Sequence, residues 1–203
     1  MKRINIVVVE GALEVPVSKK ILADLNLYVE GIPIINKGGN TKFWRDAPKY
    51  NQAAATAGPI LGLTDLDHHP CPSGLIKKHL RRGKHPQFIL RIAERELESW
   101  LLADVEARAV FFGISVDLFP FDPDAEFDPK QTLVNLARRS SKKSLREDLV
   151  PEQGSKGVVG KGYIPRMREF VEAKWRPLMA QRKSESLRRA IEAIKNATAI
   201  RHG

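Results

Sequence analysis

The stretch Pro59-Ile60-Leu61-Gly62-Leu63-Thr64 is apolar on both faces and runs directly into Asp65-Leu66-Asp67. A short continuous apolar run of this kind is typical of a strand buried inside a parallel sheet. An acid at the end of a buried strand must be paired or must bind a cation, because an isolated charge is costly in an apolar interior. We therefore expect a strand over residues 59–64 with an acidic site at its carboxyl end.

The N-terminal stretch Ile4-Asn5-Ile6-Val7-Val8-Val9 has the same character and ends in Glu10. In an open parallel α/β sheet, ligands bind at the carboxyl ends of the strands, so Glu10 should meet Asp65 and Asp67 there. The two aspartates are two residues apart, and an extended backbone would point both side chains the same way. An all-oxygen ligand set suits Mg²⁺ or Mn²⁺ and does not suit zinc. Turn chemistry, which also favours Asp, is the alternative explanation for this pair.

The rest of the N-terminal half alternates between helical and extended patterns. Helices are expected over residues 14–26, 72–82 and 94–112, with a break near 104, and strands over 27–29, 32–35 and 87–92. The secondary structure of residues 42–57 is ambiguous from the sequence. This alternation predicts an α/β fold with a mainly parallel sheet flanked by helices.

The character of the chain changes after Gly113. Residues 117–128 form an acidic loop, and Asp128-Pro129 is typical of a helix N-cap followed by the first helical position. Further helices are expected over residues 163–175 and 184–196. We therefore predict an α/β domain over residues 1–113 and a helical, basic extension over 114–203 that packs on it.

The positive charge is concentrated in the C-terminal part of the chain. The net charge is +10, and residues 129–203 hold 18 Lys/Arg against 7 Asp/Glu, whereas residues 1–128 hold 16 against 17. A basic region on a near-neutral body suits a polyanion-binding surface, and a solvated helical face explains the same pattern. A single cysteine excludes an internal disulfide and a Cys-rich zinc site. No apolar run reaches the roughly 18 residues of a membrane span, and the start lacks a signal-peptide pattern, so we expect a cytoplasmic protein without a membrane partner.

A second acidic group follows the last predicted strand and contains Glu94, Glu96 and Glu98. Glu94 and Glu98 would share a helix face. A second metal ion could bind here, about 4 Å from the first, as in two-metal phosphodiester chemistry. The alternative is a solvated helix face on which Arg91 and Arg95 pair with the glutamates. Glu14 similarly suits the N-terminal dipole of its predicted helix.

Two loops contain further candidates. His68-His69-Pro70-Cys71 could assist the acidic pair or form a plain polar loop. The run Gly154-Ser155-Lys156-Gly157-Val158-Val159-Gly160-Lys161-Gly162 could wrap phosphates through backbone N–H groups, although it is not a Walker A motif. A lysine could neutralise charge in a phosphodiester transition state, and the sequence does not choose among Lys130, Lys156 and Lys161.

Several of these residues resemble those of a known family. Glu10-Gly11 together with Asp65-Leu66-Asp67 resembles the TOPRIM domain of topoisomerases, primases and OLD-type nucleases, over about residues 1–105. Val9-Glu10-Gly11-Ala12-Leu13-Glu14 is similar to the opening of OLD-type members. Segments 96–104, 128–130, 160–163 and 184–187 resemble an uncharacterised bacterial TOPRIM-like family that is often encoded beside an ATPase.

The resemblance implies a TOPRIM-like, Rossmann-like fold and a Mg²⁺-dependent nuclease acting on DNA or RNA. It implies that Glu10, Asp65 and Asp67 bind Mg²⁺ or Mn²⁺ and act in catalysis, with Glu14 and Glu96 or Glu98 as ligands of a second ion. Lys161 is a catalytic candidate because it lies in a family-like segment. An ATPase partner and a role in antiviral defence or a toxin-like system are also expected. The alternative is a non-catalytic module that docks on an ATPase or RNA.

Overall fold

The chain is an α/β protein built on a four-stranded, all-parallel sheet with the strand order β2-β1-β3-β4. A computed structural model describes residues 3–199. The strands are β1 (Ile6–Val9), β2 (Ile34–Asn36), β3 (Ile60–Asp65) and β4 (Phe88–Ala93). Every residue of β3 is buried, as its uninterrupted apolar pattern predicts for a central strand. The predicted parallel α/β architecture is confirmed.

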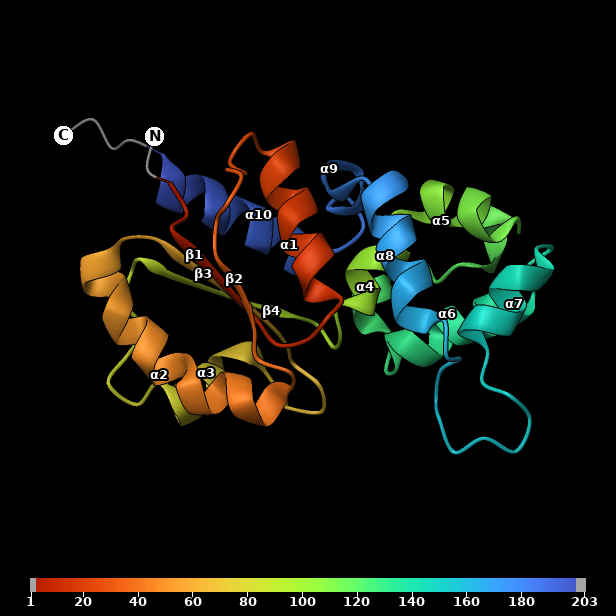
Figure 1. The fold of residues 1–203 in the computed structure, drawn as a ribbon, viewed down its shortest axis with the longest axis horizontal. Coiled ribbons are helices and arrows are strands. Elements are labelled where there is room, and N and C mark those ends of the chain that lie inside the picture. Colours follow the sequence, from red (N-terminus) through yellow and green to blue (C-terminus); the bar gives the residue numbers. More distant parts are fainter. Residues whose placement is uncertain (1–2, 200–203) are drawn as a thin grey trace.

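Helices cover both faces of this sheet (Figure 1). Helices α1 (Glu14–Asp24) and α10 (Glu185–Thr198) lie on one face, and α2 (Asn40–Ala57) and α3 (Pro72–His79) lie on the other. Successive side chains of a strand point to opposite faces, so Val7 and Val9 join the core under α1 and α10, whereas Val8 joins the core under α2.

The remaining helices gather at one end of the molecule (Figure 1). They are α4 (Glu98–Leu102), α5 (Val105–Phe112), α6 (Pro129–Arg138), α7 (Lys143–Leu149), α8 (Tyr163–Ala173) and α9 (Pro177–Ala180), with short 3₁₀ turns at Val116–Leu118 and Pro123–Ala125. Within residues 3–199, no helix is long and apolar enough to cross a membrane.

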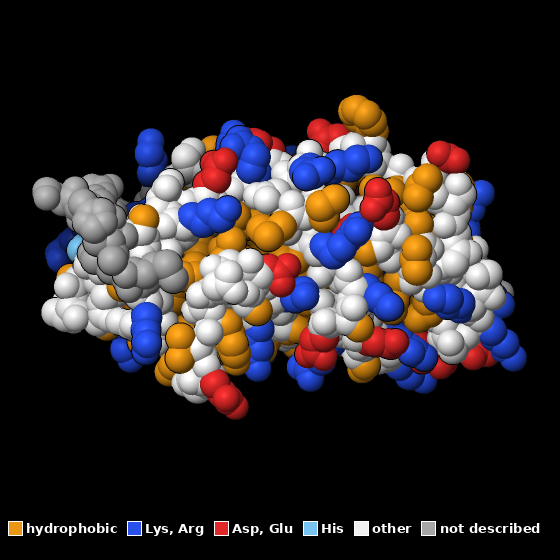
Figure 2. All heavy atoms as spheres, turned by 90° about the horizontal axis from the view of Figure 1, so that it is seen from above, with side chains coloured by type: hydrophobic (Ala, Val, Ile, Leu, Met, Phe, Trp, Pro, Cys, Tyr) orange, Lys and Arg blue, Asp and Glu red, His pale blue; other side chains and the backbone are white. Residues whose placement is uncertain are grey.

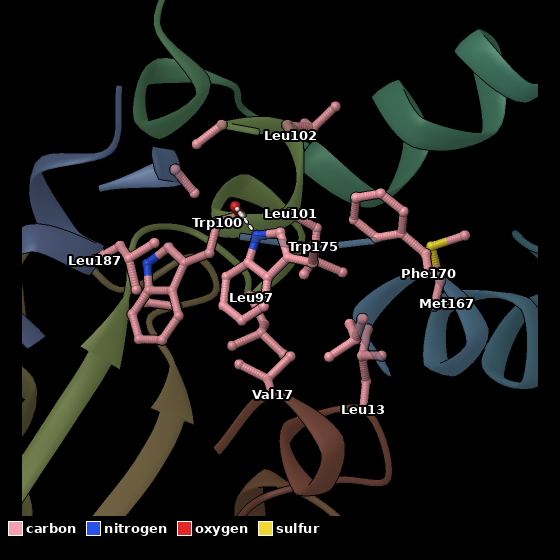
Figure 3. Packing of buried hydrophobic residues seen from close by; sticks show 14 of the residues in the cluster. Leu13, Val17, Leu97, Trp100, Leu101, Leu102, Met167, Phe170, Trp175 and Leu187 are labelled. Atoms are coloured by element: carbon pink, nitrogen blue, oxygen red, sulfur yellow. Dashed lines mark hydrogen bonds between the residues drawn. The ribbon is translucent and has the colours of Figure 1, made fainter. Parts of the chain in front are cut away.

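Two buried tryptophans hold α4 in the middle of the larger core (Figure 3). The indole N–H of Trp100 donates to Ser186 Oγ of α10 at 2.7 Å, and the indole N–H of Trp175 donates to the Trp100 carbonyl at 3.2 Å. Helix α10 packs on β4 and shares this core with β1 and α1. The core therefore continues across the predicted domain boundary at residue 113.

The predicted strand over residues 27–29 is wrong. The backbone N–H groups of Leu27 and Tyr28 both donate to the carbonyl of Leu22, at 2.7 and 3.1 Å. These bonds close the C-terminal end of α1, so the segment has no sheet partner. Within the predicted strand region 27–35, only residues 34 and 35 pair with β1, as part of β2.

The predicted helix over residues 94–112 begins later than expected and consists of two helices. Residues 94–97 form a loop that is bonded to the end of β3, since Asp67 N–H donates to the carbonyl of Arg95 at 2.8 Å. Helix α4 starts at Glu98, so the expectation that Glu94 and Glu98 share a helix face is wrong. The predicted break at residue 104 is confirmed, because Asp104 caps α5. The ambiguous residues 42–57 belong to α2.

Candidate functional site

The carboxyl edge of the sheet begins with Glu10, the first residue after β1. Its backbone N–H donates to the carbonyl of Leu63 at 3.1 Å, which continues the β1–β3 pairing. Its Oε2 accepts a hydrogen bond from the Thr64 hydroxyl and a longer one from the Asp65 N–H at 3.4 Å. Burial raises the pKa of Glu10, and the negative charge of Asp67 adds to this. The strand register therefore brings Glu10 to the two predicted aspartates.

Asn40 joins the two sides of this edge. Its Nδ2 donates to Glu10 Oε2 at 3.3 Å and to Asp67 Oδ2 at 3.0 Å. The turn before it contains Gly39 at φ 128°, a conformation that favours glycine, and this turn delivers the first residue of α2 to the sheet edge. Sequence reasoning missed Asn40, because the glycines of Lys37-Gly38-Gly39-Asn40 mark this stretch as a loop and give its Asn no further signal.

Asp65 and Asp67 reach the edge in different ways. Asp65 is the last residue of β3, is buried, and accepts a hydrogen bond from the Leu97 N–H at 2.9 Å. Asp67 lies beyond the strand at φ 50° and is only partly buried. The expected extended backbone across both residues is therefore wrong, although both carboxylates lie near Glu10.

Glu14 points into the site. Its side chain is 5% exposed, and a Cβ on Gly11 would lie 3.1 Å from its Oε2, so the glycine leaves room for the carboxylate. Burial raises the pKa of Glu14 to about 7, and the charges of Glu10 and Glu98 contribute to the rise. Glu14 is therefore not the solvated helix-terminal charge that its position allowed.

Glu98, the first residue of α4, is the last of the buried acids at this edge. It is 3% exposed, and its Oε1 accepts a hydrogen bond from the Tyr163 hydroxyl at 3.0 Å. Burial raises the pKa of Glu98, and burial raises the pKa of Tyr163 well above its ordinary value. The pKa of Asp65 is raised first by burial and then by the charges of Glu14, Glu98 and Glu10. Four carboxylates, two from strand ends (Glu10, Asp65) and two from helices (Glu14, Glu98), thus share one electrostatic environment.

Lys130 is the lysine that reaches these acids. Its Nζ lies 2.8 Å from Glu96 Oε1 and 3.5 Å from Glu98 Oε1, and its backbone N–H donates to Glu96 Oε2 at 3.0 Å. Burial alone would lower the pKa of Lys130, but Glu98 and Glu96 raise it above its ordinary value. Glu96 thus pairs with Lys130, and Arg95 donates instead to the carbonyls of Asp67 and His69.

Lys161 has a different environment. Its side chain is 88% exposed and pairs with Glu152 at 2.8 Å. The N–H groups of Gly160 and Gly162 donate to the carbonyls of Leu149 and Asp148, so these two are not free to wrap a phosphate. A Cβ on either glycine would clash with Asp148, and this close packing accounts for both glycines.

The carboxylate groups at this edge are suitable ligands for a hard cation, but in this structure their oxygens do not point to one common position. Within residues 3–199, no three His, Cys, Asp or Glu side chains are arranged as a ready-made metal site. All the candidate donors are carboxylate oxygens, which Mg²⁺ and Mn²⁺ prefer. A cation would also relieve the mutual repulsion that raises the pKa values of the buried acids. The candidate ligands are Glu10, Glu14, Asp65, Asp67, Glu98 and, with Lys130 displaced, Glu96.

Among the described residues, Lys and Arg side chains do not form one continuous patch on the face that contains α1 and α10. Figure 2 shows Lys and Arg side chains spread over this face with acidic side chains among them. Several are in ion pairs, such as Arg188 with Glu185 and Arg176 with Asp104. This face fits a solvated helical surface.

No family model, curated protein or solved structure matches the chain. The fold and the edge geometry define a class on their own: an α/β protein with a parallel sheet whose carboxyl edge gathers buried carboxylates, with Lys130 beside them.

Proposed function

We propose that this chain is a Mg²⁺-dependent nuclease with a TOPRIM-like α/β domain and a helical C-terminal extension. The observation that supports it most is the sharing of one sheet edge by Glu14, Asp65 and Glu98, which are all buried. The charges of Glu14 and Glu98 help to raise the pKa of Asp65, and the charge of Glu98 helps to raise that of Glu14. An apolar setting disfavours several ionised carboxylates unless a cation is present. A divalent ion is the simplest cation to supply that charge.

Each residue has a distinct role in the proposed site. Glu10, Asp65 and Asp67 would hold the first ion, and Glu14 with Glu98 a second. A bound Mg²⁺ supplies a Lewis acid and lowers the pKa of a coordinated water. Asn40 orients Glu10 and Asp67 through its two hydrogen bonds.

Lys130 takes the role that the sequence could not assign to one lysine. Its side chain is 31% exposed and lies beside Glu96 and Glu98, so it can face both the acids and an incoming phosphate. A fixed positive charge at this position would stabilise the negative charge that develops during phosphodiester cleavage. An ATPase partner and a defence or toxin-like role rest on the sequence resemblance.

The test is a cleavage screen over DNA and RNA with Mg²⁺ and Mn²⁺. Asp65→Asn together with Asp67→Asn should abolish metal-dependent cleavage, whereas Asp117→Asn, at an exposed position whose contact is local to Ser115, should retain it. Cleavage that survives in the double variant would refute the proposal.

A second candidate is a binding module without catalysis. It is favoured by the ion pair that already neutralises Glu96 and by the lack of a ready-made metal site within residues 3–199. Such a module would dock on an ATPase or RNA and would show no metal-dependent cleavage of any substrate in the screen.

A further inference from the structure

An exposed aromatic pair stands beside the acidic edge. The rings of His68 and Phe127 are stacked, with centroids 5.9 Å apart and an interplanar angle of 30°. Phe127 is 74% exposed, so much of its surface, beyond what His68 covers, is open to solvent. His68 directly follows Asp67, and Phe127 lies three residues before Lys130.

Both rings stand on fixed backbone. The Arg95 guanidinium donates to the carbonyls of Asp67 and His69, which holds the residues on either side of His68. On the other side, Asp128 caps α6 and accepts a hydrogen bond from the Gln131 N–H at 2.7 Å. The pair therefore bridges the end of β3 and the start of α6.

The surroundings favour a neutral ligand on these rings. Phe127 lies between Glu126 and Asp128, and Asp67 precedes His68, so a phosphate placed directly on the rings would meet like charge. A nucleobase is uncharged and has a flat face that stacks on aromatic side chains. A base on the rings would leave its phosphate free to reach Lys130 and the carboxylates.

We propose that His68 and Phe127 form a stacking platform for one unpaired base, so that the substrate is single-stranded or locally unpaired nucleic acid. This inference rests on the proposed nuclease function, because it places the base next to the phosphate to be cleaved. In a duplex each base is already stacked between its neighbours and cannot reach the platform without being flipped out. Every base has a π face, so the platform selects for strandedness and tolerates any sequence.

The test is binding of a labelled oligonucleotide of roughly 12 nucleotides, compared with its duplex, in EDTA so that neither is cleaved. Phe127→Ala should weaken single-strand binding about 5- to 100-fold and leave duplex binding within about twofold, whereas Phe127→Trp should keep single-strand binding. The matched control is Phe121→Ala, since Phe121 is 95% exposed in the same loop but has no stacking partner among the described residues. Equal losses in the two alanine variants, or equal affinity of the wild type for both oligonucleotides, would overturn the platform.

Cleavage separates this inference from the proposed function. If the wild type cleaves and Phe127→Ala lowers single-strand and duplex cleavage equally, the platform is wrong while the nuclease stands. If single-strand binding depends on Phe127 but no metal supports cleavage, the platform stands and the nuclease proposal fails.

Discussion

Glu14 lies in the first turn of α1 with its carboxyl group turned away from water. Its acidity is set by what surrounds it, since burial opposes ionisation and Glu10 and Glu98 add like charge. The pKa of Asp65, at the end of β3, is raised for the same reasons: burial and the like charge of neighbouring carboxylates. At the scale of single residues, the site is thus a set of acids that retain protons more strongly than free carboxylic acids do.

This retention predicts how stability depends on pH in the absence of metal. The folded pKa of Glu14 is raised from 4.5 to about 7, so the folded state binds its proton more tightly than the unfolded state. The free energy of unfolding should therefore fall as pH rises from about 4.5 to about 7. Glu14→Gln should flatten this fall, whereas Glu172→Gln, at an exposed position, should not. Thermal unfolding in EDTA measures it, and a wild-type slope in Glu14→Gln would show that the buried charge of Glu14 is not the cause.

Asn40 gives a second prediction at this scale. Asn40→Ala removes the amide that joins Glu10 to Asp67, and loss of such a supporting contact typically costs about 10- to 100-fold in metal affinity. The apparent Mg²⁺ dissociation constant should rise by that factor, as measured by titration. Asn135→Ala is the control, because Asn135 is exposed and its side chain, among residues 3–199, bonds to Gln131 alone. An unchanged constant would mean that Asn40 does not organise the carboxylates.

At the scale of elements, the link between α7 and α8 is fixed by close packing. Gly162 lies against Asp148, where an added Cβ would be 2.5 Å from the Asp148 Cβ. Its N–H also donates to the Asp148 carbonyl at 2.9 Å. The glycines of this loop thus serve the packing of two helices, although their sequence pattern also suits a phosphate loop.

Gly162→Ala should therefore lower the free energy of unfolding by about 1–3 kcal/mol, the usual cost of overpacking. Gly157→Ala should change it much less, because a Cβ there meets its nearest atoms at 3.4 Å. Denaturant unfolding compares the two. Equal stability of both variants would contradict the packing explanation for Gly162.

At the scale of the whole molecule, the site is assembled from distant parts of the chain. Strand ends supply Glu10, Asp65 and Asp67, α1 supplies Glu14, and α4 supplies Glu98. Helix α4 is fixed by its own Trp100, which bonds to Ser186 of α10, and by Trp175, which bonds to the Trp100 carbonyl (Figure 3). Helix α6 brings Lys130 to Glu98 of α4. Because the larger core is continuous, substitutions in the C-terminal helices should alter the positions of the side chains at the sheet edge.

The parts that the sequence predicted are those with a local physical signal. Buried strands are recognisable as apolar runs, and an acid at the end of such a run is costly enough to be noticed, so β3 and its aspartates followed directly. The position of Asn40, the loop over residues 94–97 and the choice of Lys130 all depend on hydrogen bonds or ion pairs between residues about 30 apart in the chain. Local periodicity contains no information on such pairs. The false strand over residues 27–29 has a different cause, because the backbone N–H groups of Leu27 and Tyr28 bond back to Leu22 at the end of α1.

The most direct test of the central claim is a Mg²⁺ titration monitored by the thermal midpoint at pH 8. Because a ligand that binds only the folded state stabilises it, the midpoint should rise with Mg²⁺ in the wild type and stay unchanged in Asp65→Asn. A control variant, Asp117→Asn, should respond as the wild type does. A rise of the same size in Asp65→Asn would contradict a metal site at this edge of the sheet.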